Sequence, residues 1–229
     1  MRYFEMKKRA FMSIVNNDKK LLPPNYQQVE YIESTGTQYI DTEFYPKDGK
    51  YIMTAKIKSS VVPLLGVAQY YRVFGNLSSE NASDTTLYRY QYRGLNEGTG
   101  YNTDAVCCGT AVNGEAKALF TWQNYTDYEI EVDGIDKTYT INGKTAVYVG
   151  KVASYIAQTS IKLMAANSTG TRDAMKFYNF KVENQKGERV VDMYPCYRKS
   201  DNVIGMYDVA RNMFITNAGT GVFLKGESI

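Results

Sequence analysis

The chain has 229 residues, of which 44% are hydrophobic and 22% charged, and its formal net charge is +3. It contains no histidine, which excludes Ser-His and Cys-His nucleophile pairs, histidine-bound zinc and an imidazole pH switch. The three cysteines, Cys107, Cys108 and Cys196, are an odd count that does not fit a disulfide framework. The 21 tyrosines favour strands and rigid contact area, as in a β-rich recognition protein.

The basic excess lies at the N-terminus. Residues 1–20 carry six basic and two acidic side chains, so the other 209 residues carry 27 − 6 = 21 basic and 24 − 2 = 22 acidic ones. We expect residues 1–22 to form an arm that docks the domain onto a larger assembly; a frayed tail and a membrane-surface helix are the alternatives. The candidate docking residues are Arg2, Phe4, Lys7, Lys8, Arg9 and Phe11.

Two further classes of function are not expected. The nearly neutral body argues against an extended nucleic-acid surface. The arm lacks the uninterrupted apolar core of a secretory signal, and no run of 18 apolar residues predicts a transmembrane segment.

Short strands are expected throughout residues 23–229, which follow the paired prolines Pro23 and Pro24. Alternating or apolar segments bounded by turn residues predict them at 26–32, 38–44, 50–58, 63–75, 85–93, 116–122, 160–166, 174–183, 188–194, 203–208 and 213–216.

The clearest hairpins are expected in residues 127–149. Asp133-Gly134 and Asn142-Gly143 each separate alternating segments, which is a strong hairpin pattern. No helical pattern of 12 or more residues follows Pro24. The chain is therefore predicted to be an all-β, two-sheet antiparallel sandwich or jelly roll with a short N-terminal arm.

The two ends of the domain carry a family resemblance. LPPNYQQVEYIESTGTQYIDTEFYP opens it, and MKFYNFKVENQKGERVVDMYPCYRKSDNVIGMYDVARNMFITNAGTGVF closes it. Both resemble the concanavalin A-like, laminin-G-like jelly roll of phage structural proteins and gut-bacterial surface proteins, as does YEIEVDGIDKTYTINGK between them. The resemblance extends from about residue 22 to 223, although 61–120 aligns with nothing in the family. It implies a binding scaffold, often for carbohydrate, on virions or cell surfaces.

The shared motifs also have structural explanations. Asp208 is expected to cap a turn. Four glycines suit turns or positive backbone angles, and four tyrosines are expected to pack between the sheets. The glycines are Gly36, Gly205, Gly219 and Gly221, and the tyrosines are Tyr31, Tyr39, Tyr178 and Tyr207.

Two segments are candidate sugar-binding surfaces. Residues 87–93 place tyrosines and arginines on alternate faces of a strand, so one face offers rings for stacking and the other rigid donors. A Trp-Asn-Tyr group follows a later strand. In both segments the aromatic rings are alternatively core residues. The candidates are Arg89, Tyr90, Tyr92, Arg93, Trp122, Asn124 and Tyr125.

Acidic residues suggest catalysis or calcium less strongly. Glu129, Glu131 and Asp133 share one strand face, as a glycosidase pair requires, but their Glu-x-Glu-x-Asp order departs from the Glu-x-Asp-x-x-Glu pattern of jelly-roll glycosidases. We interpret them as a solvated face and predict no catalytic residue. Calcium is an alternative, with Asn102, Asp104 and Asp133 as ligands, but no dense Asp/Asn loop supports it, so no metal or cofactor is predicted.

The sequence predicts a non-enzymatic structural or adhesion protein of a phage-like particle. Its jelly roll faces host glycan or a neighbouring subunit, and its arm contacts other virion proteins after assembly in the host cytoplasm. The alternative is a carbohydrate-binding module on the bacterial surface or secreted; a glycoside hydrolase is the third hypothesis. A homo-oligomer is compatible with each.

Overall fold

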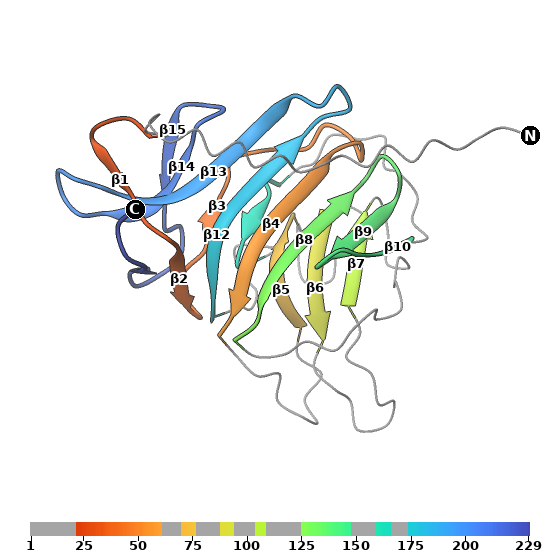
Figure 1. Ribbon diagram of the computed structural model, residues 1–229, viewed down its shortest axis with the longest axis horizontal. Helices are drawn as coiled ribbons and strands as arrows, with labels where there is room; N and C mark the ends of the chain where they lie inside the picture. The colour runs from red at the N-terminus through yellow and green to blue at the C-terminus, as the bar shows by residue number, and fades with distance from the viewer. Residues whose placement is uncertain are drawn as a thin grey trace, which may run out of the picture.

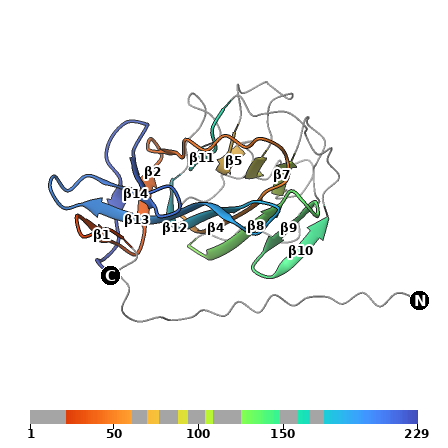
Figure 2. The same ribbon diagram turned by 90° about the horizontal axis from the view of Figure 1, so that it is seen from above.

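The computed structural model describes residues 22–60, 70–76, 88–93, 104–108, 125–147, 159–165 and 174–229. The secondary-structure elements assigned in these ranges are all β-strands, and every strand pair is antiparallel. They form two sheets that lie face to face (Figure 1, Figure 2). The prediction of an all-β chain is confirmed for the described residues, in a β-sandwich-like arrangement.

The large sheet has the strand order β10-β9-β8-β4-β12-β13-β14-β15, and β1, β2 and β16 pair alongside this path. Its strands are β1 (Tyr26–Gln28), β2 (Ile32–Thr35), β4 (Ile52–Ser59), β8 (Asp127–Asp133), β9 (Thr138–Ile141), β10 (Lys144–Val147), β12 (Ala174–Glu183), β13 (Arg189–Arg198), β14 (Ile204–Asp208), β15 (Met213–Thr216) and β16 (Leu224–Lys225).

The small sheet has the order β3-β11-β5-β6-β7 and covers one face of the large sheet (Figure 2). Its strands are β3 (Ile40–Asp41), β5 (Tyr70–Gly75), β6 (Tyr88–Arg93), β7 (Asp104–Cys108) and β11 (Lys162–Leu163).

The core lies between the sheets because alternate residues of each strand point inward. In β8, Tyr128, Ile130 and Val132 are buried, whereas Asp127 and Glu129, which alternate with them, are exposed. Phe74 of the small sheet meets Phe180 of the large sheet with ring centroids 5.4 Å apart. The opposite face of the large sheet, called the outer face below, is therefore free for polar side chains.

The opening and closing motifs of the family resemblance lie against each other. The Thr220 amide donates to the Thr37 carbonyl at 3.2 Å, and the Gln38 side chain donates to the Val222 carbonyl at 3.1 Å. Asn217 accepts hydrogen bonds from the amides of Tyr39 and Gly219. Segments almost 180 residues apart in sequence are thus tied together, which gives these motifs a structural role.

Most predicted strands are confirmed, including the two hairpins of residues 127–147; the first closes through a turn at residues 134–137. Two strands were not predicted, β7 and β16, and β2 extends into residues 34 and 35, where the gap between the predicted strands 26–32 and 38–44 left no strand. The predicted strand at 116–122 and the N-terminal arm lie outside the described residues. The described residues contain no helix with the length and apolar character needed to cross a membrane.

The prediction that four tyrosines pack between the sheets is wrong for three of them, because two are half-exposed and Tyr207 packs in a separate cluster with Leu22 and Cys196. Tyr39 and Tyr207 are buried, but Tyr31 and Tyr178 are half-exposed, with their rings 5.8 Å apart in an edge-to-face contact. Lys176 on the outer face lies 4.0 Å from the centre of the Tyr31 ring. These two tyrosines therefore belong to the outer face.

Replacing Gly219 with alanine tests the contact between the two motifs. A Cβ at Gly219 would lie 2.1 Å from the Thr37 carbonyl oxygen, so backbone must move. We expect Gly219→Ala to lower the free energy of unfolding by about 2–3 kcal/mol, measured by urea denaturation. The control is Gly187→Ala, where φ is +76° but no atom lies within 4 Å, so only backbone strain of about 1 kcal/mol applies. Equal losses in both variants would contradict the close approach.

Candidate functional site

A hollow of about 530 Å³ opens in the outer face of the large sheet. It lies over β12, β4, β8 and β9, which are consecutive in the sheet; Figure 1 shows the order of these strands. This volume lies within the usual range for small-molecule sites. Its polar lining residues are Thr54, Lys56, Glu129, Glu131, Thr140, Asn179 and Lys181. Since all of them come from regular strands, the backbone of the sheet sets their spacing.

A β-bulge in β12 shapes one wall of the hollow. Phe177 pairs with Ile57, but the next pair is Asn179 with Lys56, so Tyr178 is an extra residue. Tyr178 and Asn179 are consecutive and both half-exposed, whereas the residues on either side of them, Phe177 and Phe180, are fully buried. The bulge therefore adds a tyrosine and an amide to the outer face together, as bulges near functional sites often do.

The Asn-Gly turn between β9 and β10 fixes the other wall. Asn142 (φ 46°) and Gly143 (φ 79°) adopt the left-handed conformation that such turns require. The Asn142 side chain accepts from the Glu129 amide at 2.7 Å and donates to the Asp127 carbonyl at 3.2 Å. These bonds hold the hairpin against β8, and Gly143 itself lines the hollow.

Opposite charges lie in adjacent columns across the hollow. Lys56 of β4 pairs in register with Glu129 of β8 and with Asn179 of β12. In the next row, Thr54 lies between Glu131 and Lys181. The acidic column thus comes from β8 and the basic residues from β4 and β12.

Several of these polar groups are available to a ligand. Lys56 and Lys181 lie over the rings of Tyr178 and Tyr194, 5.7 and 5.5 Å from the ring centres. Among the described residues neither lysine forms an ion pair within 4.0 Å. The Asn179 amide and the exposed Glu129 carboxylate likewise make no hydrogen bond within the described part of the chain.

Tyr178 beside the hollow is a neutral phenol over a wide pH range. Burial, followed by the nearby Asp127 carboxylate, raises the pKa of Tyr178 to about 12. The same cause acts on Tyr194, where burial and then Asp192 raise the pKa to about 12. Both rings therefore remain uncharged flat surfaces beside Lys56 and Lys181 at physiological pH.

The structure places only some of the sequence-predicted site residues. Arg89, Tyr90, Tyr92 and Arg93 lie on β6 of the small sheet, with Tyr90 paired to Phe74, but their side chains lie outside the described part. Trp122, Asn124 and all six docking-arm candidates fall outside the described residues. Tyr125 is described and is 68% exposed, with φ 55°, just before β8.

The acidic strand face was predicted correctly as solvated, because Glu129 is exposed and Glu131 and Asp133 are half-exposed. Asp133 accepts hydrogen bonds from the amides of Ile135 and Asp136 at 2.7 and 3.0 Å, so its carboxylate caps the turn. No group of three or more metal-ligating side chains occurs among the described residues. The other two calcium candidates, Asn102 and the side chain of Asp104, are not described.

A second polar cluster joins β3 to β11. Lys162, which is buried, lies 3.2 Å from the Asp41 carboxylate and donates to the Ser160 hydroxyl at 3.1 Å, and that hydroxyl donates to Asp41. These contacts tie β3 to the start of β11.

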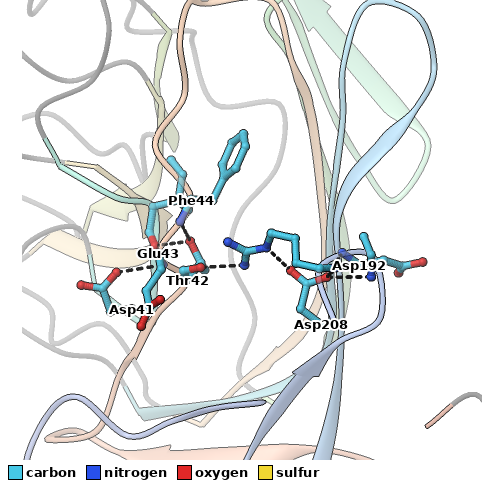
Figure 3. Close-up of polar contacts among 9 residues, drawn as sticks. Asp41, Thr42, Glu43, Phe44, Asp192 and Asp208 are labelled. Carbon is cyan, nitrogen blue, oxygen red and sulfur yellow. Dashed lines mark hydrogen bonds and ion pairs between the residues drawn. The ribbon is translucent and has the colours of Figure 1, made fainter. Parts of the chain in front are cut away.

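A third cluster lies inside the sandwich (Figure 3). Asp208 is completely buried and accepts hydrogen bonds from the amides of Asp192, Ala210 and Arg211. The Arg211 guanidinium donates to the Asp208 carboxylate at 2.6 Å and to the carbonyl of Thr42 at 2.7 Å. The predicted turn cap at Asp208 is confirmed, and the cluster also connects the two sheets.

Comparison of the chain with models of known protein families gave no match, and none of the curated proteins matches it significantly. The resemblance drawn from the sequence motifs therefore stays a prediction.

Replacing Arg211 with methionine tests the buried cluster. The change leaves the Asp208 carboxylate buried without its counter-ion, so we expect a loss of about 3 kcal/mol in the free energy of unfolding, measured by urea denaturation. The control is Arg198→Met, which removes an exposed pair with Asp201 at the same sequence spacing and should leave the unfolding midpoint nearly unchanged. Similar midpoints in both variants would rule out the connecting role.

Proposed function

We propose that this protein is a non-enzymatic recognition protein that binds carbohydrate through the hollow on the outer face of its large sheet. The observation that supports this most directly is that the side chains of Lys56, Glu129 and Asn179, around a space of about 530 Å³, form no hydrogen bond or ion pair with other described residues. Sugar hydroxyls need such groups, and the neighbouring Tyr178 ring offers a flat apolar surface of the kind that stacks on sugars.

We further propose that the domain is a concanavalin A-like jelly roll displayed by a phage-like particle, with residues 1–22 attaching it to other virion proteins. The resemblance of the opening and closing motifs and the net charge of +4 in residues 1–20 support this setting. A surface or secreted carbohydrate-binding module of a bacterium is the alternative, and in it the same hollow binds sugar.

Deleting residues 1–22 tests the virion setting. We expect the full-length chain to co-sediment with particles from the phage or prophage that encodes it, and the deletion variant to stay in the supernatant, because the basic arm supplies the contacts. Glycan binding by the deletion variant is the control for folding. Co-sedimentation of both forms would remove the arm from the docking role, and co-sedimentation of neither would favour the bacterial alternative.

A glycan array probed with the full-length protein tests the binding proposal. We expect at least one glycan to bind, and Asn179→Ala to weaken its affinity at least tenfold by calorimetry, because the amide faces the hollow. The matched control is Gln185→Ala, an exposed amide in the β12–β13 turn, which should leave affinity unchanged. Loss of binding on Tyr90→Ala or Trp122→Ala, with Asn179→Ala unaffected, would move the site away from the hollow.

One observation favours hydrolysis as a second candidate function. Glu129 and Glu131 both line the hollow, so two carboxylates are present where a glycan is proposed to lie. The glycans bound on the array decide this point when they are incubated with wild-type protein and with the Glu129→Ala, Glu131→Ala double variant. Release of reducing ends by wild type alone would replace the binding proposal with a hydrolase.

A further inference from the structure

The outer face of the large sheet separates its charges by strand. The charged side chains that β8 contributes to this face are all carboxylates, namely Asp127, Glu129, Glu131 and Asp133. The next two strands along the sheet, β4 and β12, contribute Lys56, Lys58, Lys176 and Lys181, together with Glu183 at the last position of β12. The hollow lies across the boundary between the two groups.

Two of the charges that reach the hollow, Glu129 and Lys181, form no ion pair with each other. Glu129 and Lys181 lie on strands separated by β4 and are offset by two residues along it, so spacings of about 4.8 Å between strands and about 3.4 Å per residue place their backbones roughly 12 Å apart. Neither side chain forms an ion pair with another described residue. Lys181 instead lies against the Tyr194 ring, which holds the ammonium at the edge of the hollow.

Neutral hydrogen-bonding groups occupy the space between these charges. Thr54 lies in register between Glu131 and Lys181, and Asn179 is added to the same face by the bulge. A ligand with a single charge is attracted by one column and repelled by the other, whereas a ligand with both charges interacts favourably with each.

We propose that the glycan bound here is zwitterionic: its ammonium group lies against Glu129, its carboxylate or phosphate lies against Lys181 and Lys56, and its hydroxyls contact Thr54 and Asn179. This inference rests on the proposed function, and it names the class of sugar that the hollow selects. A chain in which an amino sugar and an acidic unit are neighbours carries both charges that this arrangement favours.

Oligosaccharides that alternate glucosamine and glucuronic acid provide matched probes. The zwitterionic form keeps both the free amine and the carboxylate. The N-acetylated form carries only the carboxylate charge, and the form with the reduced carboxyl carries only the ammonium charge. We expect the zwitterionic form to bind the full-length protein at least tenfold more tightly than either singly charged form, by calorimetry at low ionic strength. A fourth oligomer, with free amines and phosphodiesters in place of the uronate, shows which anion is preferred.

Variants assign each charge to its column. Lys181→Gln should abolish the difference in affinity between the zwitterionic form and the form with the reduced carboxyl. Glu129→Gln should abolish the difference between the zwitterionic form and the N-acetylated form. Lys186→Gln and Glu227→Gln, exposed changes of the same type outside the hollow, should leave all affinities unchanged.

The outcomes separate this inference from the proposed function. Equal affinity for all forms, or array binding of neutral glycans only, overturns the zwitterionic ligand and leaves carbohydrate binding in the hollow intact. Absence of binding both to these oligomers and on the array overturns both proposals.

Discussion

The buried carboxylate of Asp208 constrains how the two sheets meet. A charged group with no exposed surface requires compensation within the protein, and three backbone amides and the Arg211 guanidinium provide it. Because Arg211 also bonds the Thr42 carbonyl, this compensation connects the β14–β15 turn to the chain just after β3 (Figure 3). The orientation of the small sheet over the large one thus depends in part on a single ion pair.

The contact between the opening and closing motifs strengthens the same region. The Asn217 side chain, the Gln38 side chain and the close approach at Gly219 all join the segment before β3 to the segment after β15. These bonds and the Asp208 cluster involve inward-facing groups or the edge near β3. The outer face of β4, β8 and β12 takes no part in them, so its side chains can change without loss of the sheet contact. Such a division leaves a rigid framework for a binding surface.

The strands were largely predictable from the sequence because their cause is local. Alternation placed β4, β8 and β9 close to their observed positions, and the Asn142-Gly143 turn was predicted from residue types that tolerate positive φ. The bulge at Tyr178 was not predictable, because a tyrosine and an asparagine in a strand fit either face until the partner register is known. Because the bulge was not foreseen, Tyr178 was wrongly assigned to the core.

Only the acidic strand of the candidate site was predictable from the sequence, for a related reason. Glu129 and Glu131 lie on one strand, so their shared face followed from period-two alternation. Asn179 and Lys181 join them through pairing with Lys56 and Thr54 of β4, which lie more than 120 positions away in sequence. No local pattern records that register. The contact between Arg211 and Thr42, separated by 169 residues, was hidden in the same way.

The surroundings of Glu129 favour binding over acid catalysis. A general acid in glycoside hydrolysis must hold its proton near neutral pH, which requires burial in apolar surroundings or a close like charge. Glu129 is exposed, and the residue directly across from it in the sheet is Lys56. An exposed carboxylate beside lysines and an amide is suited to orienting a polar ligand. The charge columns that weaken the case for hydrolysis are the same ones that would make the hollow selective for a ligand carrying both charges.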